Sequence, residues 1–101
     1  MGKTTEVSHM KALTMFYLED CGYCTRAFRA LDELFTENPA YREVPIKKIE
    51  ESRHPELADQ YDYYATPAIF EGDEKLFEAR LFMSYDDIRN GLKRALDHAL
   101  E

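Results

Sequence analysis

Both cysteines of the 101-residue chain lie in the run Leu18-Glu19-Asp20-Cys21-Gly22-Tyr23-Cys24. A nearly continuous apolar segment precedes this run, as in a buried strand, and apolar residues at helical spacing follow it. A helix start exposes unpaired N–H groups and the positive end of the helix dipole, which favour a thiolate over a thiol. A second sulfur one helical turn on can attack the mixed disulfide that the first one forms. Strand, Cys-x-x-Cys and helix in this order therefore predict a site for dithiol–disulfide exchange.

The overall composition restricts the class of protein. A length of 101 residues predicts one domain, and 45% hydrophobic with 33% charged residues is ordinary for a globular protein. The formal net charge of −7 disfavours binding to nucleic acid and to anionic membrane surfaces. No apolar run approaches the roughly 18–20 residues of a membrane span. We therefore expect neither nucleic acid nor membrane among the partners.

The first ten residues lack any periodicity, which predicts a disordered leader at residues 1–10 and a domain at residues 11–101. The leader has no hydrophobic signal core, so export is not indicated and a cytoplasmic protein is expected. In a reducing compartment a close cysteine pair is more often redox-active or metal-binding than structural.

The rest of the sequence predicts alternating strands and helices. The expected segments are, in order, a strand at residues 12–18, a helix from the cysteines to Asn38-Pro39, a strand at 44–49, two turns of helix from Pro55, a strand at 68–70 opened by Thr66-Pro67, a strand at 75–82, and a helix from Ser84 to the C-terminus. The strand at 75–82 has Leu76, Ala79 and Leu81 among its apolar positions. The order βαβαββα predicts an α/β fold with a four-stranded mixed sheet and helices on both faces.

This element order, the motif Cys21-Gly22-Tyr23-Cys24 and the Thr66-Pro67 step together resemble the thioredoxin superfamily over residues 12–100. The resemblance implies a thioredoxin-like fold with a cis peptide bond between Thr66 and Pro67, facing the cysteines. An incoming disulfide-bearing peptide would pair there with the backbone of Thr66. Gly22, Tyr23, Thr66 and Pro67 are accordingly the expected substrate-binding residues.

Two branches of the superfamily share features with this chain. Tyr23 occupies the place of the tyrosine in the glutaredoxin motif Cys-Pro-Tyr-Cys, whereas Gly22 matches the glycine of the thioredoxin motif Cys-Gly-Pro-Cys. Residues 82–87 lie where glutaredoxins carry a Gly-Gly pair that helps to hold glutathione, and this chain lacks those glycines. Where thioredoxins have a tryptophan and a buried aspartate, it has Asp20 and Met15.

The two sulfurs are expected to differ in role. Cys21, at the helix start, is the predicted nucleophile, and Cys24, one turn into the helix, the shielded resolving thiol. The helix start and Arg26 favour the thiolate of Cys21, while Glu19 and Asp20 disfavour it, each by about 0.3–1 kcal/mol. We therefore predict only a modestly lowered pKa for Cys21. A less stabilised thiolate makes the dithiol–disulfide couple of Cys21 and Cys24 more reducing, so it should favour the reduction of substrate disulfides.

Other interpretations of the cysteine pair stay open. Tetrahedral zinc needs four ligands, and His9, His54 and His98 are not at ligand spacing, so no metal and no bound cofactor are expected. One alternative is a metal or Fe–S cluster that bridges two chains through Cys21. The other is a buried cysteine pair with no chemical role.

The sequence thus predicts a thiol–disulfide oxidoreductase that reduces protein disulfides through Cys21 and Cys24. Its expected partners are disulfide-bearing proteins and an electron donor, either a reductase or a small thiol, and it is expected to be a monomer. Two alternatives are a glutaredoxin that uses glutathione and a non-catalytic thioredoxin-like module that binds partners through residues 61–66. The tyrosines at 61, 63 and 64 either pack against the sheet or cover a groove beside Thr66.

Overall fold

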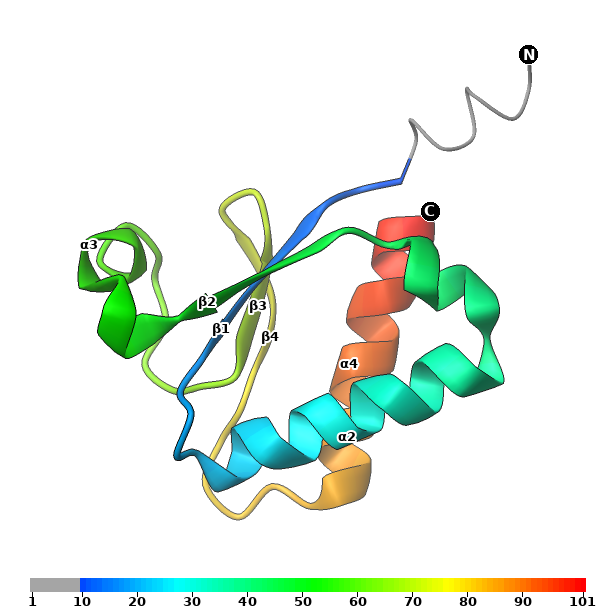
Figure 1. Ribbon diagram of the computed structural model, residues 1–101, viewed down its shortest axis with the longest axis horizontal. Coiled ribbons are helices and arrows are strands. Elements are labelled where there is room, and N and C mark those ends of the chain that lie inside the picture. Colours follow the sequence, from blue (N-terminus) through cyan, green and yellow to red (C-terminus); the bar gives the residue numbers. More distant parts are fainter. Residues whose placement is uncertain (1–9) are drawn as a thin grey trace.

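A computed structural model describes residues 10–101 of the chain, and its centre is a four-stranded sheet (Figure 1). The strands are β1 (Leu13–Tyr17), β2 (Ile46–Glu50), β3 (Ala68–Glu71) and β4 (Glu74–Glu78), in the order β2-β1-β3-β4. β1 is parallel to β2, while β1 with β3 and β3 with β4 are antiparallel. The predicted four-stranded mixed sheet is therefore confirmed. Of the predicted leader, residues 1–9 lie outside the described residues, and Met10 packs against the core.

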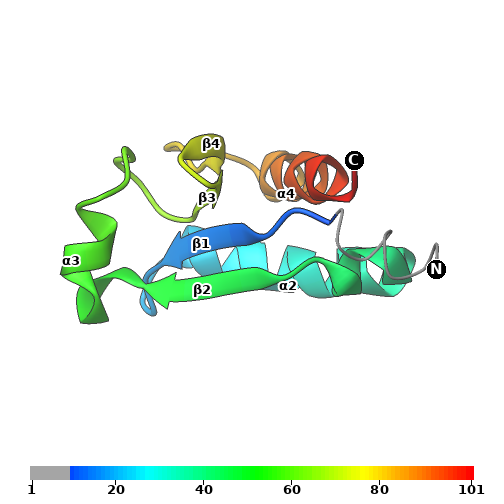
Figure 2. The same ribbon diagram turned by 90° about the horizontal axis from the view of Figure 1, so that it is seen from above.

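Helices cover both faces of the sheet unequally (Figure 2). The long helices α2 (Gly22–Glu37) and α4 (Tyr85–Leu100) pack against each other on one face. The other face carries α3 (Pro55–Ala58), a single turn where a longer helix was expected. Two 3₁₀ turns, η1 (Pro39–Glu43) and η2 (Glu51–Arg53), flank β2. Among the described residues, no helix combines the length and apolar character needed to cross a bilayer.

The apolar run of β1 reflects burial on both faces. Because successive side chains of a strand point to opposite faces, Leu13 and Met15 join the core beneath α2 and α4. Phe16 joins the second cluster, beneath α3. The same alternation in β3 sends Ile69 to the first cluster and Phe70 to the second. A central strand can therefore be apolar throughout.

The ends of the long helices follow local sequence signals. α2 ends at Asn38, whose side chain accepts a hydrogen bond from the N–H of Ala40 and so begins η1. At the start of α4, the Ser84 side chain accepts from the N–H of Asp87, and the Asp87 carboxylate accepts from the N–H of Ser84. This reciprocal capping box satisfies two N–H groups at the start of α4, which agrees with the helix start expected at Ser84.

The predicted extent of the fourth strand is wrong. β4 ends at Glu78, and Leu81 and Phe82 are 78% and 93% exposed instead of lying in a strand. The last contact is a hydrogen bond from the N–H of Ala79 to the carbonyl of Pro67. Pro67 has no N–H to return, so the ladder stops there. The chain then turns through Phe82 at φ 66.

Candidate dithiol site

Cys21 lies at the junction of the loop after β1 and the start of α2. It is the N-cap of the helix, with extended backbone (φ −105, ψ 119), and its Sγ accepts a hydrogen bond of 3.2 Å from the N–H of Cys24. The sulfur thus takes the place of the usual capping oxygen. Cys21 is half-buried, whereas Cys24, inside the first turn, is 1% exposed. Both cysteines carry free thiols. Because of their different burial, Cys21 is partly accessible to solvent and Cys24 is not.

Thr66 brings the start of β3 against the same sulfur. Its carbonyl accepts from the Cys21 thiol, and its hydroxyl donates to Cys21 Sγ, each at 3.6 Å. The peptide bond between Thr66 and Pro67 is cis, as the resemblance implied. The structure therefore brings together Cys21, Cys24, Thr66 and Pro67 from separate parts of the chain.

The surroundings shift the two thiol pKa values in opposite directions. Partial burial acts to raise the pKa of Cys21, but hydrogen bonding from the side chains of Cys24 and Thr66 and from backbone N–H groups outweighs it, so this pKa lies below its ordinary value of 9.0. Burial, followed by the interaction with the Cys21 side chain, raises the pKa of Cys24 to about 11. The lowered pKa predicted for Cys21 is confirmed. Its cause is hydrogen bonding to the sulfur, where the sequence suggested a balance of neighbouring charges.

Tyr23 ties the cysteine segment to the loop that follows β4. Its hydroxyl accepts a hydrogen bond of 2.7 Å from the N–H of Phe82, and the guanidinium of Arg26 lies 5.4 Å from its ring centroid. The residue expected to present a surface to substrate therefore also anchors a loop. Gly22 is exposed, and a Cβ added there would meet only Arg26, at 3.8 Å.

A buried carboxylate that the sequence did not reveal fixes the loop before Cys21. Glu50, at the end of β2 and 6% exposed, accepts from the N–H of Glu19 at 3.0 Å and from the N–H of Ser52 at 2.8 Å. A hydrogen bond from the Ser52 hydroxyl, followed by backbone N–H groups, lowers the pKa of Glu50. Arg53 then binds the side chain of Glu19 at 2.9 Å. These contacts hold the chain just before Cys21.

A second carboxylate, Glu78, fixes the segment before Thr66. One oxygen accepts from the N–H groups of Tyr64 at 2.5 Å and Ala65 at 2.8 Å, and the other binds Lys75 at 2.7 Å. Burial opposes ionisation, but the Lys75 contact and the two N–H groups lower the pKa of Glu78. Glu78 therefore positions the loop that delivers Thr66 to Cys21.

Metal-ligand spacing occurs away from the cysteines. In the part of the chain that the structure describes, the ligand atoms of Glu71, Glu74 and His98 lie within 4.8 Å of one another. β3 begins at Ala68, two residues after Thr66, and ends at Glu71, so this group lies at the end of the strand away from Cys21. It includes neither cysteine, and His98 is hydrogen-bonded to Glu71 at 2.8 Å. The chemistry available at the cysteines is that of a thiolate and a buried thiol.

Comparison with known proteins gave a structural likeness alone. No family model matches the chain, and no curated protein matches its sequence. A thioredoxin from Fasciola hepatica superposes with a TM-score of 0.61 at 18% identity, covering 97% of this chain and 88% of that one. The oxidised thioredoxin from Plasmodium falciparum gives 0.62 at 14% identity, covering 99% and 90%. A thioredoxin from Halobacterium salinarum gives 0.57 at 18% identity, covering 100% and 86%. The chain therefore has the thioredoxin fold, in agreement with the resemblance seen in its sequence.

Proposed function

We propose that the protein is a thiol–disulfide oxidoreductase that reduces disulfides of other proteins through Cys21 and Cys24. The observation that carries the proposal is that the two sulfurs differ in exposure and in pKa. Cys21 is accessible, caps a helix and has a lowered pKa, while Cys24 is buried behind it with a raised pKa. An accessible thiolate backed by a protonated thiol is the arrangement that exchange with an external disulfide requires.

The first step uses the thiolate of Cys21. Its Sγ attacks one sulfur of the substrate disulfide, a new sulfur–sulfur bond forms, and the substrate bond breaks. The departing substrate sulfur leaves as a thiolate and takes a proton from solvent. Thr66 contacts Cys21 and, with Pro67, is the proposed contact for the substrate backbone. Gly22 and Tyr23, which follow Cys21 in the chain, are the other proposed substrate contacts.

The second step uses Cys24. Its thiol loses a proton and attacks Cys21 Sγ, which releases the second substrate sulfur as a thiolate that is then protonated. The substrate has gained two electrons and two protons, and the protein holds a Cys21–Cys24 disulfide. An external donor, a reductase or a small thiol, must then return the dithiol. We propose that the protein works in this way as a cytoplasmic monomer, without a bound cofactor.

Reduction of insulin disulfides tests the proposal. The wild type should catalyse the reaction with dithiothreitol as donor, and Cys21→Ser should show no turnover above background because the nucleophile is lost. Cys24→Ser should accumulate a mixed disulfide with the substrate, visible by mass spectrometry, because the resolving thiol is missing. Circular dichroism of each variant controls for folding. A wild type with no Cys21-dependent turnover would identify a binding module instead.

The choice of electron donor separates the two redox interpretations. Glu19 and Asp20 are exposed next to Cys21, and Phe82 stands in the loop where glutaredoxins have glycine. Negative charge there disfavours glutathione, which carries two carboxylates. We expect a thioredoxin reductase to support faster insulin reduction than glutathione with its reductase. The reverse order would identify a glutaredoxin.

A further inference from the structure

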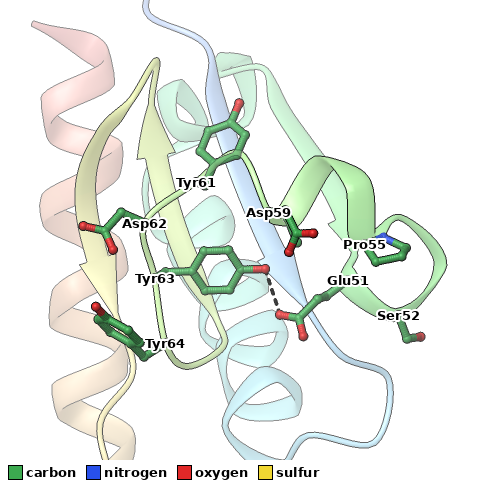
Figure 3. A pocket seen from close by; sticks show the side chains of 9 residues that line it. Glu51, Ser52, Pro55, Asp59, Tyr61, Asp62, Tyr63 and Tyr64 are labelled. Carbon is green, nitrogen blue, oxygen red and sulfur yellow. Dashed lines mark hydrogen bonds between the residues drawn. The ribbon is translucent and has the colours of Figure 1, made fainter.

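A hollow of about 490 Å³ opens between α3 and the segment at residues 59–64 (Figure 3). Its lining combines aromatic rings with carboxylates. The residues of interest are Tyr61, Tyr63, Tyr64, Glu51, Asp59 and Asp62. Tyr61 and Tyr63 pack against Phe16 on their inner side, which confirms packing as one role of this cluster. Tyr64 is 91% exposed.

Two carboxylates converge in this hollow. The Tyr63 hydroxyl donates a 2.7 Å hydrogen bond to Glu51, and Asp59 lies beside the same pair (Figure 3). Burial, then the bond to Glu51 and the negative charges of Glu51 and Asp59, raises the pKa of Tyr63, which stays a neutral donor. Within residues 10–101, none of Glu51, Asp59 and Asp62 forms a salt bridge. The nearby Arg53 is engaged by Glu19. Glu51 and Asp59 therefore give the hollow negative charge that no salt bridge among the described residues neutralises.

A cation of the chain itself, which is salt-bridged to Glu78, lies beside the end of the hollow formed by Asp62 and Tyr64. The ammonium of Lys75 binds the carbonyl of Asp62 at 3.1 Å and lies 6.0 Å from the ring centroid of Tyr64. Aromatic faces and carboxylates attract cations by the same electrostatics. The end formed by Glu51, Asp59 and Tyr63 has this chemistry, and no lysine or arginine within residues 10–101 forms a salt bridge with either carboxylate there.

We infer that this hollow binds a basic side chain, lysine or arginine, of the disulfide-bearing protein that Cys21 attacks. The inference rests on the proposed function and adds a substrate class to it. Tyr64 is two residues from Thr66, whose carbonyl lies 3.6 Å from Cys21 Sγ. An extended peptide spans about 3.3–3.6 Å per residue, so a basic residue three to five positions from the attacked cysteine, about 10–18 Å away, reaches the hollow.

Paired disulfide peptides test the preference. One peptide carries arginine at the third to fifth positions on both sides of the reactive cysteine, and the other carries citrulline, the uncharged isostere. We expect kcat/KM about five-fold higher for the arginine peptide, the size of an exposed ion pair with a cation–π contact. The ratio should fall towards one in a Glu51→Gln/Asp59→Asn double variant. It should stay unchanged in Asp73→Asn, which removes a charge from the β3–β4 turn outside the hollow.

Each result bears on a separate claim. Equal rates for the two peptides would overturn the basic-residue inference while the reductase stands, as would an equal loss of preference in Asp73→Asn. Failure to reduce either peptide would overturn the proposed function. The hollow is then tested alone by titrating Cys21→Ser with N-acetylarginine amide and N-acetylcitrulline amide. The arginine compound should shift the amide resonances of Asp59 and Tyr63, and the citrulline compound should not. Equal shifts with the two compounds, or none with either, would overturn the inference.

Discussion

The two faces of the sheet are covered in different ways. Beneath α2 and α4 lies a broad cluster of fully buried, mostly aliphatic side chains, including Met15, Leu34 and Leu92. The opposite face carries only the turn α3 and a few aromatic rings, with Tyr61 and Tyr63 packed on Phe16 and only partly buried. Because burial of apolar area is the main stabilising term, the first face supplies most of the stability.

The thinner face carries polar contacts that guide the chain to the cysteines. Its tyrosine segment is bound by Glu78 through backbone N–H groups and leads directly into Thr66. Such contacts add little burial but fix a loop in one conformation. The face covered by α2 and α4 therefore supplies most of the stability, while the face covered by α3 positions the loop that leads to Thr66. Substitutions on each face can test this separation.

The same truncation on each face should have unequal effects. Leu92→Ala removes a side chain with no exposed surface and leaves a cavity between α4 and the sheet, so we expect a loss of about 2–5 kcal/mol. Leu57→Ala, at a half-buried residue of α3, should cost about 1 kcal/mol. Urea unfolding followed by circular dichroism measures both. Equal losses would show that the two faces contribute alike.

A single added methyl group probes the packing of α4. A Cβ at Gly91 would lie 2.3 Å from the ring of Phe77, so Gly91→Ala should destabilise the fold by about 1–3 kcal/mol. Gly22→Ala is the matched control, because its Cβ would meet Arg26 only at 3.8 Å, and its free energy of unfolding should change by less than about 0.5 kcal/mol. A tolerated Gly91→Ala would mean that α4 can move away from β4.

Glu78→Gln should lower stability in a pH-dependent way. The folded pKa of Glu78 lies below its ordinary value of 4.5, so the carboxylate stabilises the fold above that pH, and the contribution is lost as pH falls through the folded pKa. We expect a loss of about 1 kcal/mol at pH 7 that vanishes in strong acid. Urea midpoints from pH 7 to pH 2 measure it. A difference that persists at low pH would exclude this role for the charge.

The smallest expected effect is at the sulfur itself. Thr66→Val removes the hydroxyl that donates to Cys21 Sγ, so the pKa of Cys21 should rise towards 9.0. The rate of alkylation by iodoacetamide against pH would shift accordingly, while Cys24 should stay unreactive below about pH 10. Thr25→Val is the control, since its hydroxyl contacts the carbonyl of Cys21 and not the sulfur. Identical profiles for both variants would show that the Thr66 hydroxyl does not lower the pKa of Cys21.

Sequence predicted those features that depend on residues near one another in the chain. The cap at Ser84, the end of α2 at Asn38-Pro39 and the helix start at Cys21 all follow from adjacent side chains. The end of β4 did not, because an apolar pattern describes which residues favour burial and says nothing about Pro67 on the partner strand. Phe82 at positive φ carries no signal either, since glycine is the usual residue there.

The supports of the site were hidden for a related reason. Glu50 binds a residue 31 positions away and Glu78 one 14 positions away, and in sequence each is one acidic residue among 20. Their buried or partly buried positions become visible only when the sheet brings the loops together. The motif Cys-x-x-Cys and the Thr66-Pro67 step identified the centre of the site from the sequence. The carboxylates that fix the surrounding loops could be found only from the structure.

The use of sulfur as the cap of α2 couples chemistry to the integrity of the helix. An alkyl group or a second sulfur bonded to Cys21 Sγ turns that atom from a possible thiolate into a neutral sulfur, which is a weaker acceptor for the N–H of Cys24. An ionised sulfur accepts more strongly than a neutral one. The first turn of α2 is therefore held most firmly when Cys21 is a thiolate, which is the form that the proposed exchange reaction uses.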